Sequence, residues 1–149
     1  MKAANPYLNF KGNTLQAFEF YRSVFGGEFE MLLRFRDFGD NQMGIAEQDL
    51  DKIAHVALRL GPSMLMGTDV VDSMPMTFTP GNNFYIALTP DTADEADALF
   101  GKLAEGGKVE MPLQATAWAE KYGSLVDKFG VQWMVSYEGA VQFGGAQPA

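Results

Sequence analysis

The chain has 149 residues, 47% of them hydrophobic, which is enough for the buried core of one compact domain over residues 1–149. A formal net charge of −8, without any run of Lys or Arg, argues against nucleic acid and membrane surfaces as partners. The absence of Cys excludes disulfides and thiolate metal sites, and no apolar run is long enough to span a membrane. From both observations we expect a cytoplasmic location.

A first module is expected over about residues 5–70. The alternating stretch NPYLNFKGN predicts a strand with Leu8 and Phe10 toward the core. NTLQAFEFYRSVFGG predicts a helix with Asn13 as its N-cap and a glycine stop. Three further strands are predicted at EFEMLLRFRDF, IAHVALRLG and SMLMG, with the acidic segment DFGDNQMGIAEQDLDK as a loop between the first two.

A second module with the same order is expected over about residues 83–138. NNFYIALTPDT opens it as a strand, and Thr92 and Glu95 form a capping-box pair at the start of the helix that follows. Strands are then predicted at KVEMPL, KYGSLVDKF and VQWMVSYE. The segment VVDSMPMTFTPGNN has the composition of a linker, and residues 139–149 are expected to be a flexible tail.

Strand alternation divides each strand into a core face and an opposite face. Val56, Leu58 and Leu60 are predicted to face a helix, as are the sets Phe84, Ile86, Leu88 and Trp133, Val135. In EFEMLLRFR, burial of Phe29, Met31, Leu33 and Phe35 would place Arg34 and Arg36 on the opposite side.

The tandem order resembles the vicinal oxygen chelate superfamily, and the segments YLNFKGNTLQAFEFYRSVFGGE, AHVALRLG, MPLQATAWAEKYG and DKFGVQWMV are similar to its PhnB-like branch. The resemblance implies an α+β fold in which two tandem βαβββ modules form a cupped mixed β-sheet with helices on its convex face. It also implies a homodimer, because members complete their cups by pairing or exchanging modules.

In metal-using members, His or Glu ligands come from the first and last strands of each module. This chain offers Asn, Tyr and Met at those strands, Met134 stands at the position of the usual final Glu, and there is one His in the whole sequence. Thioether sulfur does not replace a carboxylate toward a borderline divalent ion. The sequence therefore predicts no metal and no cofactor.

The side chains predicted to line the cup are aromatic, amide and cationic, a mixture that suits a small polar or anionic ligand. They are Tyr7, Asn9, Arg34, His55, Arg59, Asn83, Tyr85, Trp118, Tyr122, Gln132 and Met134. Alternatives remain for three groups. The arginines pair with Glu or Asp across the sheet or lie in solvent, His55 is buried and hydrogen-bonded within the sheet, and the pair Trp118 and Tyr122 packs against the neighbouring module.

The function expected is binding of a small molecule without a metal. Two other classes remain open. One is a lyase, isomerase or transferase that uses His55 or a tyrosine as acid or base, and the other is an interaction module with a vestigial cup. A demethylubiquinone methyltransferase label occurs among the relatives, but no glycine-rich loop for a methyl-donor nucleotide is present in the sequence.

Overall fold

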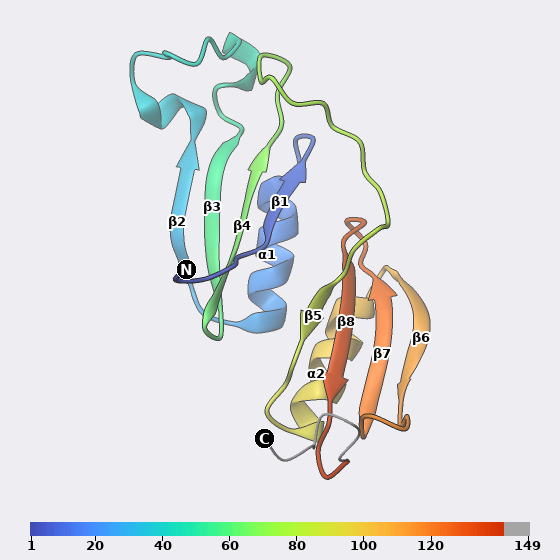
Figure 1. Ribbon diagram of the computed structural model, residues 1–149. Coiled ribbons are helices and arrows are strands. Elements are labelled where there is room, and N and C mark those ends of the chain that lie inside the picture. Colours follow the sequence, from blue (N-terminus) through green and yellow to red (C-terminus); the bar gives the residue numbers. More distant parts are fainter. Residues whose placement is uncertain (142–149) are drawn as a thin grey trace. The chain divides into compact units, whose positions relative to one another are not determined.

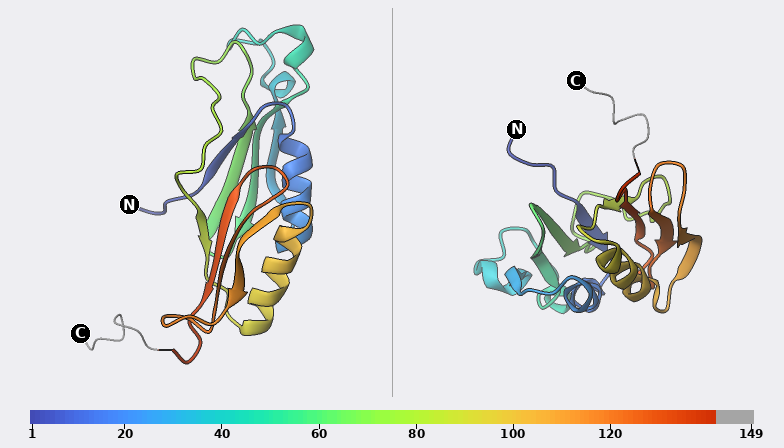
Figure 2. Two further views of the ribbon diagram at one scale, coloured as in Figure 1. Left: turned by 90° about the vertical axis from the view of Figure 1, so that its right-hand side faces the viewer. Right: turned by 90° about the horizontal axis from the view of Figure 1, so that it is seen from below.

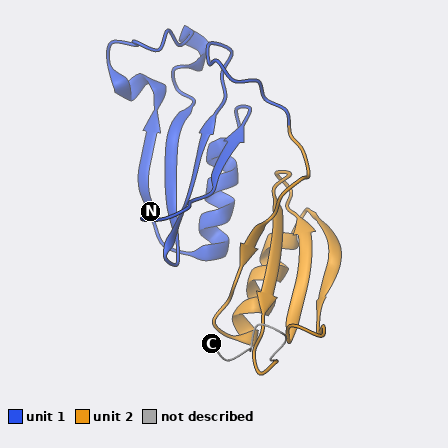
Figure 3. Ribbon diagram, in the orientation of Figure 1, with its two compact units in different colours: residues 1–79 blue, residues 80–149 orange. Residues whose placement is uncertain are grey.

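The structure is a computed structural model that describes residues 1–141. The chain divides into two compact units, Met1–Thr79 and Pro80–Ala149 (Figure 3). Each unit holds one four-stranded sheet and one long helix (Figure 1).

Unit 1 contains the first βαβββ module. Its elements are β1 Tyr7–Phe10, α1 Thr14–Phe25, β2 Phe29–Arg34, β3 Ile53–Leu60 and β4 Ser63–Asp69. The strands lie in the order β1-β4-β3-β2; β1 runs parallel to β4, and the other pairs are antiparallel. The long connection from β2 to β3 carries two short 3₁₀ helices. Glu47–Asp49 lies where the sequence predicted a loop, whereas Phe35–Phe38 lies at the end of the stretch EFEMLLRFRDF, which was predicted as a strand; the strand ends at Arg34.

Unit 2 repeats this topology. Its elements are β5 Ile86–Leu88, α2 Ala93–Ala104, β6 Lys108–Gln114, β7 Lys121–Val126 and β8 Gln132–Tyr137. The order β5-β8-β7-β6, with β5 parallel to β8, is the counterpart of unit 1 strand for strand. The prediction of two tandem βαβββ modules with mixed sheets is confirmed.

The core of each unit lies between the helix and one face of its own sheet (Figure 2). In unit 1, Val56 and Leu58 are fully buried, and Leu8 and Phe10 are nearly so, as alternation predicted. In unit 2, Trp133 and Val135 are fully buried, and the Trp133 indole donates a hydrogen bond of 2.8 Å to the buried Asp127. The opposite face of each sheet is called its helix-free face below.

The predicted core position of Phe84 is wrong, because this side chain is 60% exposed. The strand β5 begins only at Ile86, so the alternation that holds for Ile86 does not extend back to Phe84. The linker prediction also needs correction at its start: Val70 and Val71 are buried, and Val71 packs with Phe35 and Ile45.

Two β-bulges, one in β2 at Glu30 and one in β3 at Ala54, correct the prediction for β2. The register shifts between Phe29 and Met31 and again between Leu33 and Arg34. Phe29 stays on the helix side, where the Arg22 guanidinium lies 4.7 Å from the centre of its ring, but Met31 is 46% exposed. A bulge adds one residue to one strand and so reverses the faces that follow it.

The two helices begin with different caps. Thr92 accepts a hydrogen bond from the Glu95 amide, as predicted for a capping box. Asn13 occupies the N-cap position of α1 but makes no side-chain cap. Instead the buried Asp69 carboxylate at the end of β4 accepts bonds from the amides of Gly12, Thr14 and Ile53 and from the Thr14 hydroxyl.

The predicted tail lies mostly outside the described residues. Gly139, Ala140 and Val141 are described, and the Ala140 amide bonds the Glu120 carboxylate. Within residues 1–141, no helix combines the length and the apolar character needed to cross a bilayer.

Candidate functional site

The helix-free face of unit 1 carries a hydrogen-bonded pair of aromatic side chains, Tyr7 from β1 and His55 from β3. The Tyr7 hydroxyl lies 3.0 Å from Nδ1 of His55, and the two rings stack with centroids 5.6 Å apart. His55 reaches this face because it alternates with the buried Val56. Burial raises the pKa of the Tyr7 hydroxyl, and the Thr68 hydroxyl opposes part of this rise. The pair can pass a proton between phenol and imidazole.

A mostly apolar row lies beside this pair. Met66 of β4 stands between Tyr7 and Ala57, and Met31 of β2 follows Ala57 at the edge of the sheet. Asn9 is exposed in the next row, opposite Thr68. Tyr7, Asn9 and His55 therefore share one face, as the sequence predicted.

The arginines of unit 1 already have acidic or carbonyl partners. Arg59 binds the Glu30 carboxylate with Nε at 2.7 Å, and Arg36 binds Asp51 in the same way at 2.8 Å. Arg34, the last residue of β2, donates to the backbone carbonyl of Asp51, which lies two residues before β3. For Arg59 the cross-sheet ion pair, which the sequence left open as an alternative, is the arrangement observed.

Unit 2 places its candidate residues on and around β5, β7 and β8. The Tyr122 hydroxyl donates to the Met134 sulfur at 3.3 Å, and the Trp118 ring stands edge-on to Tyr122 with centroids 5.2 Å apart. Gln132 is buried and donates to the Phe84 carbonyl. Trp118 and Tyr122 thus contact each other, and Met134 contacts Tyr122.

Tyr85 and Asn83 precede β5 rather than lying within it. Tyr85 donates a hydrogen bond of 2.7 Å to the Glu110 carboxylate of β6. This bond, burial and the negative charge of Glu110 raise the pKa of Tyr85, and Tyr122 adds to the rise. Asn83 is exposed.

Two glutamates that bind predicted site residues, Glu30 with Arg59 and Glu110 with Tyr85, were not themselves among the residues predicted from the sequence. Each follows an apolar residue and precedes a methionine, in EFEM and KVEM. Each also stands where the strand register shifts, between Phe29 and Met31 and between Val109 and Met111. The repeated letters could have identified them.

A divalent metal of the kind that the sequence resemblance implies does not fit these residues. The end strands present phenol, amide and thioether groups: Tyr7 and Asn9 on β1, Met66 on β4, and Met134 on β8. These are poor ligands for divalent transition metals. Among residues 1–141, no three His, Asp or Glu side chains are grouped so as to hold an ion.

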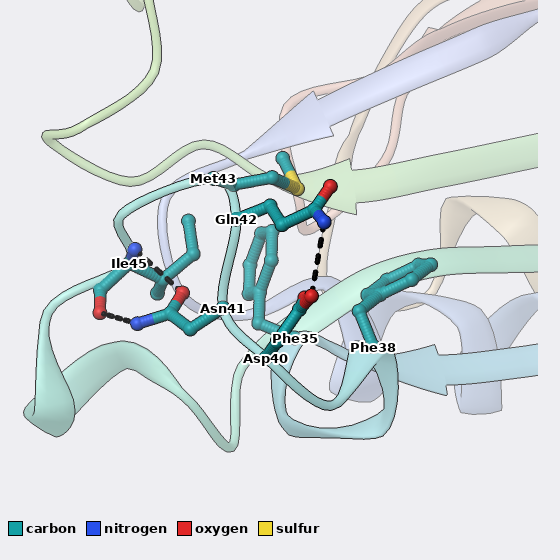
Figure 4. A pocket seen from close by; sticks show the side chains of 7 residues that line it. All are labelled: Phe35, Phe38, Asp40, Asn41, Gln42, Met43 and Ile45. Carbon is teal, nitrogen blue, oxygen red and sulfur yellow. Dashed lines mark hydrogen bonds between the residues drawn. The ribbon is translucent and has the colours of Figure 1, made fainter.

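A separate small pocket lies in the connection between β2 and β3 (Figure 4). Its volume is about 160 Å³. Asn41 closes one side by bonding both the amide and the carbonyl of Ile45, each at 2.8 Å. None of the sequence-predicted site residues lines it; the lining residues are Phe35, Phe38, Asp40, Asn41, Gln42, Met43 and Ile45.

The tandem βαβββ topology defines a protein with the glyoxalase-like fold. A glyoxalase-related enzyme from Fulvimarina pelagi has this fold, with a TM-score of 0.61 at 16% identity, over 96% of this chain and 99% of that one. At this level of identity the likeness shows the fold alone.

The family follows from nearer relatives. Residues 2–136 match the family model described as 3-demethylubiquinone-9 3-methyltransferase. Protein PA1353 from Pseudomonas aeruginosa is 40% identical, with a TM-score of 0.80, over 91% of this chain and 96% of its own. A PhnB protein from Bacillus cereus is 30% identical, with a TM-score of 0.69, over 90% and 98%. Protein YjdN of Escherichia coli K12 is 33% identical over 139 residues, 89% of this chain and 92% of that protein. The chain belongs to this PhnB-like family.

Proposed function

We propose that the protein binds a small polar organic molecule in the cytoplasm, without a metal, at the helix-free faces of its sheets. The observation that carries the proposal is the Tyr7–His55 pair. It combines a hydrogen-bonding hydroxyl and an imidazole with the apolar surface of Met66 and Ala57 on the same face. Binding sites for small molecules typically combine apolar surface with a few placed polar groups.

If the ligand is anionic, the arginines are the side chains that would attract its charge. Arg59 and Arg34 are engaged with Glu30 and with the Asp51 carbonyl, so an anion would have to displace these partners. Tyr7 and His55 are therefore the groups that we expect to contact a polar ligand first.

The test is a ligand screen followed by variants of the pair. Metabolites that raise the melting temperature are titrated against the wild type, Tyr7→Phe and His55→Gln. Losing the hydroxyl bond should weaken binding by about tenfold, the equivalent of 1.4 kcal/mol. Tyr137→Phe is the matched control, because it removes a tyrosine hydroxyl at the end of β8. Saturable binding that neither variant weakens would contradict the role of the pair.

The second candidate is an acid–base enzyme, a lyase or isomerase, and the 3.0 Å contact between the Tyr7 hydroxyl and His55 Nδ1 favours it. In such a reaction the tyrosine exchanges a proton with a substrate carbon while the imidazole exchanges one with the tyrosine. Exchange of substrate protons for deuterium, followed by NMR and lost in Tyr7→Phe, would select the enzyme. Binding without exchange or turnover would select the binding protein.

Methyl transfer, the activity in the family's description, is not the function that we propose. The sequence contains no GxGxxG loop of the kind that holds a nucleotide cofactor. The side chains assembled on the helix-free faces are phenol, imidazole, amide and thioether groups, which suit hydrogen bonding and proton transfer.

A further inference from the structure

The two modules repeat one unusual feature, a glutamate at a bulge in the edge strand. Glu30 lies between Phe29, opposite Leu58, and Met31, opposite Ala57. Glu110 lies between Val109, opposite Leu125, and Met111, opposite Ser124. A bulge turns a side chain away from the regular alternation of its strand. The strand registers thus make Glu30 and Glu110 counterparts.

Unit 1 shows what such a glutamate binds. The Arg59 guanidinium bonds both Glu30 oxygens, through Nε at 2.7 Å and Nη2 at 3.3 Å. Arg59 shares the helix-free face with His55 and Ala57. In this module the bulge glutamate is therefore neutralised by a planar cation from the neighbouring strand.

Unit 2 has the glutamate without the arginine. Leu125 and Ser124 are the counterparts of Leu58 and Ala57, so Val126 stands at the position of Arg59. Lys108 lies opposite Val126 but makes no ion pair with Glu110, and no other Lys, Arg or His of residues 1–141 does so. The Glu110 charge is met by a hydrogen bond from Tyr85 alone, among the described residues.

Among the described residues, the aromatic side chain that contacts Glu110 is Tyr85, and Tyr122 and Trp118 belong to the same part of unit 2. Tyr85 donates to the carboxylate at 2.7 Å and keeps 37% of its surface exposed. Tyr122 is two residues along β7 from Ser124 and is close enough to act electrostatically on Tyr85. Trp118 stands against Tyr122 at an interplanar angle of 77° and is also exposed. Aromatic faces beside a carboxylate attract organic cations.

We propose that unit 2 binds an organic cation, an alkylammonium or guanidinium group, at Glu110 between the rings of Tyr85, Tyr122 and Trp118. The ligand's charged group takes the place that Arg59 holds in unit 1. This inference rests on the proposed function only in treating the helix-free face of unit 2 as a binding surface, and it assigns that surface a ligand class.

The experiment uses the full chain and four probes followed by NMR. Ethylguanidinium and tetramethylammonium are the cations, tert-butanol is the neutral control and propionate is the anionic control. We expect saturable shifts at Trp118 and Tyr122 with the cations and none with the controls. Glu110→Gln, which keeps an acceptor for Tyr85 but removes the charge, should weaken cation binding about tenfold or more. Glu30→Gln is the matched control and should leave the affinity unchanged.

A second variant tests the correspondence between the modules. Val126→Arg should place a guanidinium beside Glu110, as Arg59 stands beside Glu30 in unit 1. This internal cation should abolish binding of the cationic probes. If circular dichroism shows that Val126→Arg is unfolded, the cation affinity of Glu110→Gln alone tests the inference. Cation affinity equal in wild type and folded Glu110→Gln, or no saturable cation binding, would overturn the inference. Propionate shifts that Tyr7→Phe removes would then leave the proposed function standing, whereas no binding by any probe or screened metabolite would remove both.

Discussion

Tyr7 is a partly buried phenol, 47% exposed, whose ionisation should destabilise the fold. Burial raises its pKa above the ordinary 10.0, so the folded state favours the neutral hydroxyl. A group with a raised folded pKa contributes stability that is complete below its unfolded pKa and lost as pH rises through the folded pKa. The free energy of unfolding should therefore fall above about pH 10, and Tyr7→Phe should fall less steeply. Urea denaturation at a series of pH values measures both slopes. Identical slopes would show that Tyr7 titrates alike in both states.

The candidate residues differ in how far alternation could locate them. Tyr7, Asn9 and His55 share a face because β1 alternates throughout and the register of β3 against β4 is regular from Val56 to Leu60. The Arg59–Glu30 pair could not be derived this way, because a bulge displaces Glu30 by one position. Trp118 precedes β7 in a segment without strand periodicity, so only the structure shows its contact with Tyr122.

At the scale of elements, the topology was readable because each module carries a periodic helix between alternating strands. Thr92 and Glu95 marked the start of α2 correctly. Asn13 did not cap α1, because the acceptor for the first turn comes from Asp69, 55 residues along the chain from Thr14. Sequence patterns report local hydrogen bonds, and a cap supplied by a distant strand leaves no such pattern.

The packing of α1 on β4 depends on the absence of a side chain at Gly67. A Cβ there would lie 2.7 Å from the Phe18 ring and 3.0 Å from the Leu8 carbonyl oxygen. Gly67→Ala should lower the free energy of unfolding by about 1–3 kcal/mol through overpacking. Gly101→Ala in α2 is the matched control, because nothing lies within 4 Å of its Cβ position, and it should raise stability by about 0.5–1 kcal/mol. Urea denaturation of both variants measures the two signs, and a stabilised Gly67→Ala would show that the helix shifts without cost.

For the whole molecule, we expect stability and binding that do not depend on a metal. The end strands offer phenol, amide and thioether groups, which bind divalent ions poorly. Protein purified without chelator should contain far less than one equivalent of Zn, Ni, Mn or Fe by elemental analysis. Its melting temperature should be unchanged by EDTA. About one equivalent of tightly held metal per chain would refute this.

We also propose a homodimer. Each sheet ends in strands whose outer edges are unpaired within the unit, and Met31 and Leu32 on β2 and Val109 and Met111 on β6 are exposed apolar residues at such edges. Pairing of two chains would cover surfaces of this kind. Light scattering should give twice the chain mass of 16.4 kDa. A monomer mass across a wide concentration range would contradict the proposal.

The Asp69 carboxylate joins three backbone amides from two segments that are far apart in sequence, Gly12 and Thr14 before α1 and Ile53 at the start of β3. These amide protons can exchange with solvent only when their hydrogen bonds to the buried carboxylate open. A movement of the carboxylate would break all three bonds together. Their deuterium exchange should therefore follow a single opening event, with closely matching protection factors under native conditions. Hydrogen-exchange NMR would then report the turn before α1 and the start of β3 as one cooperative unit.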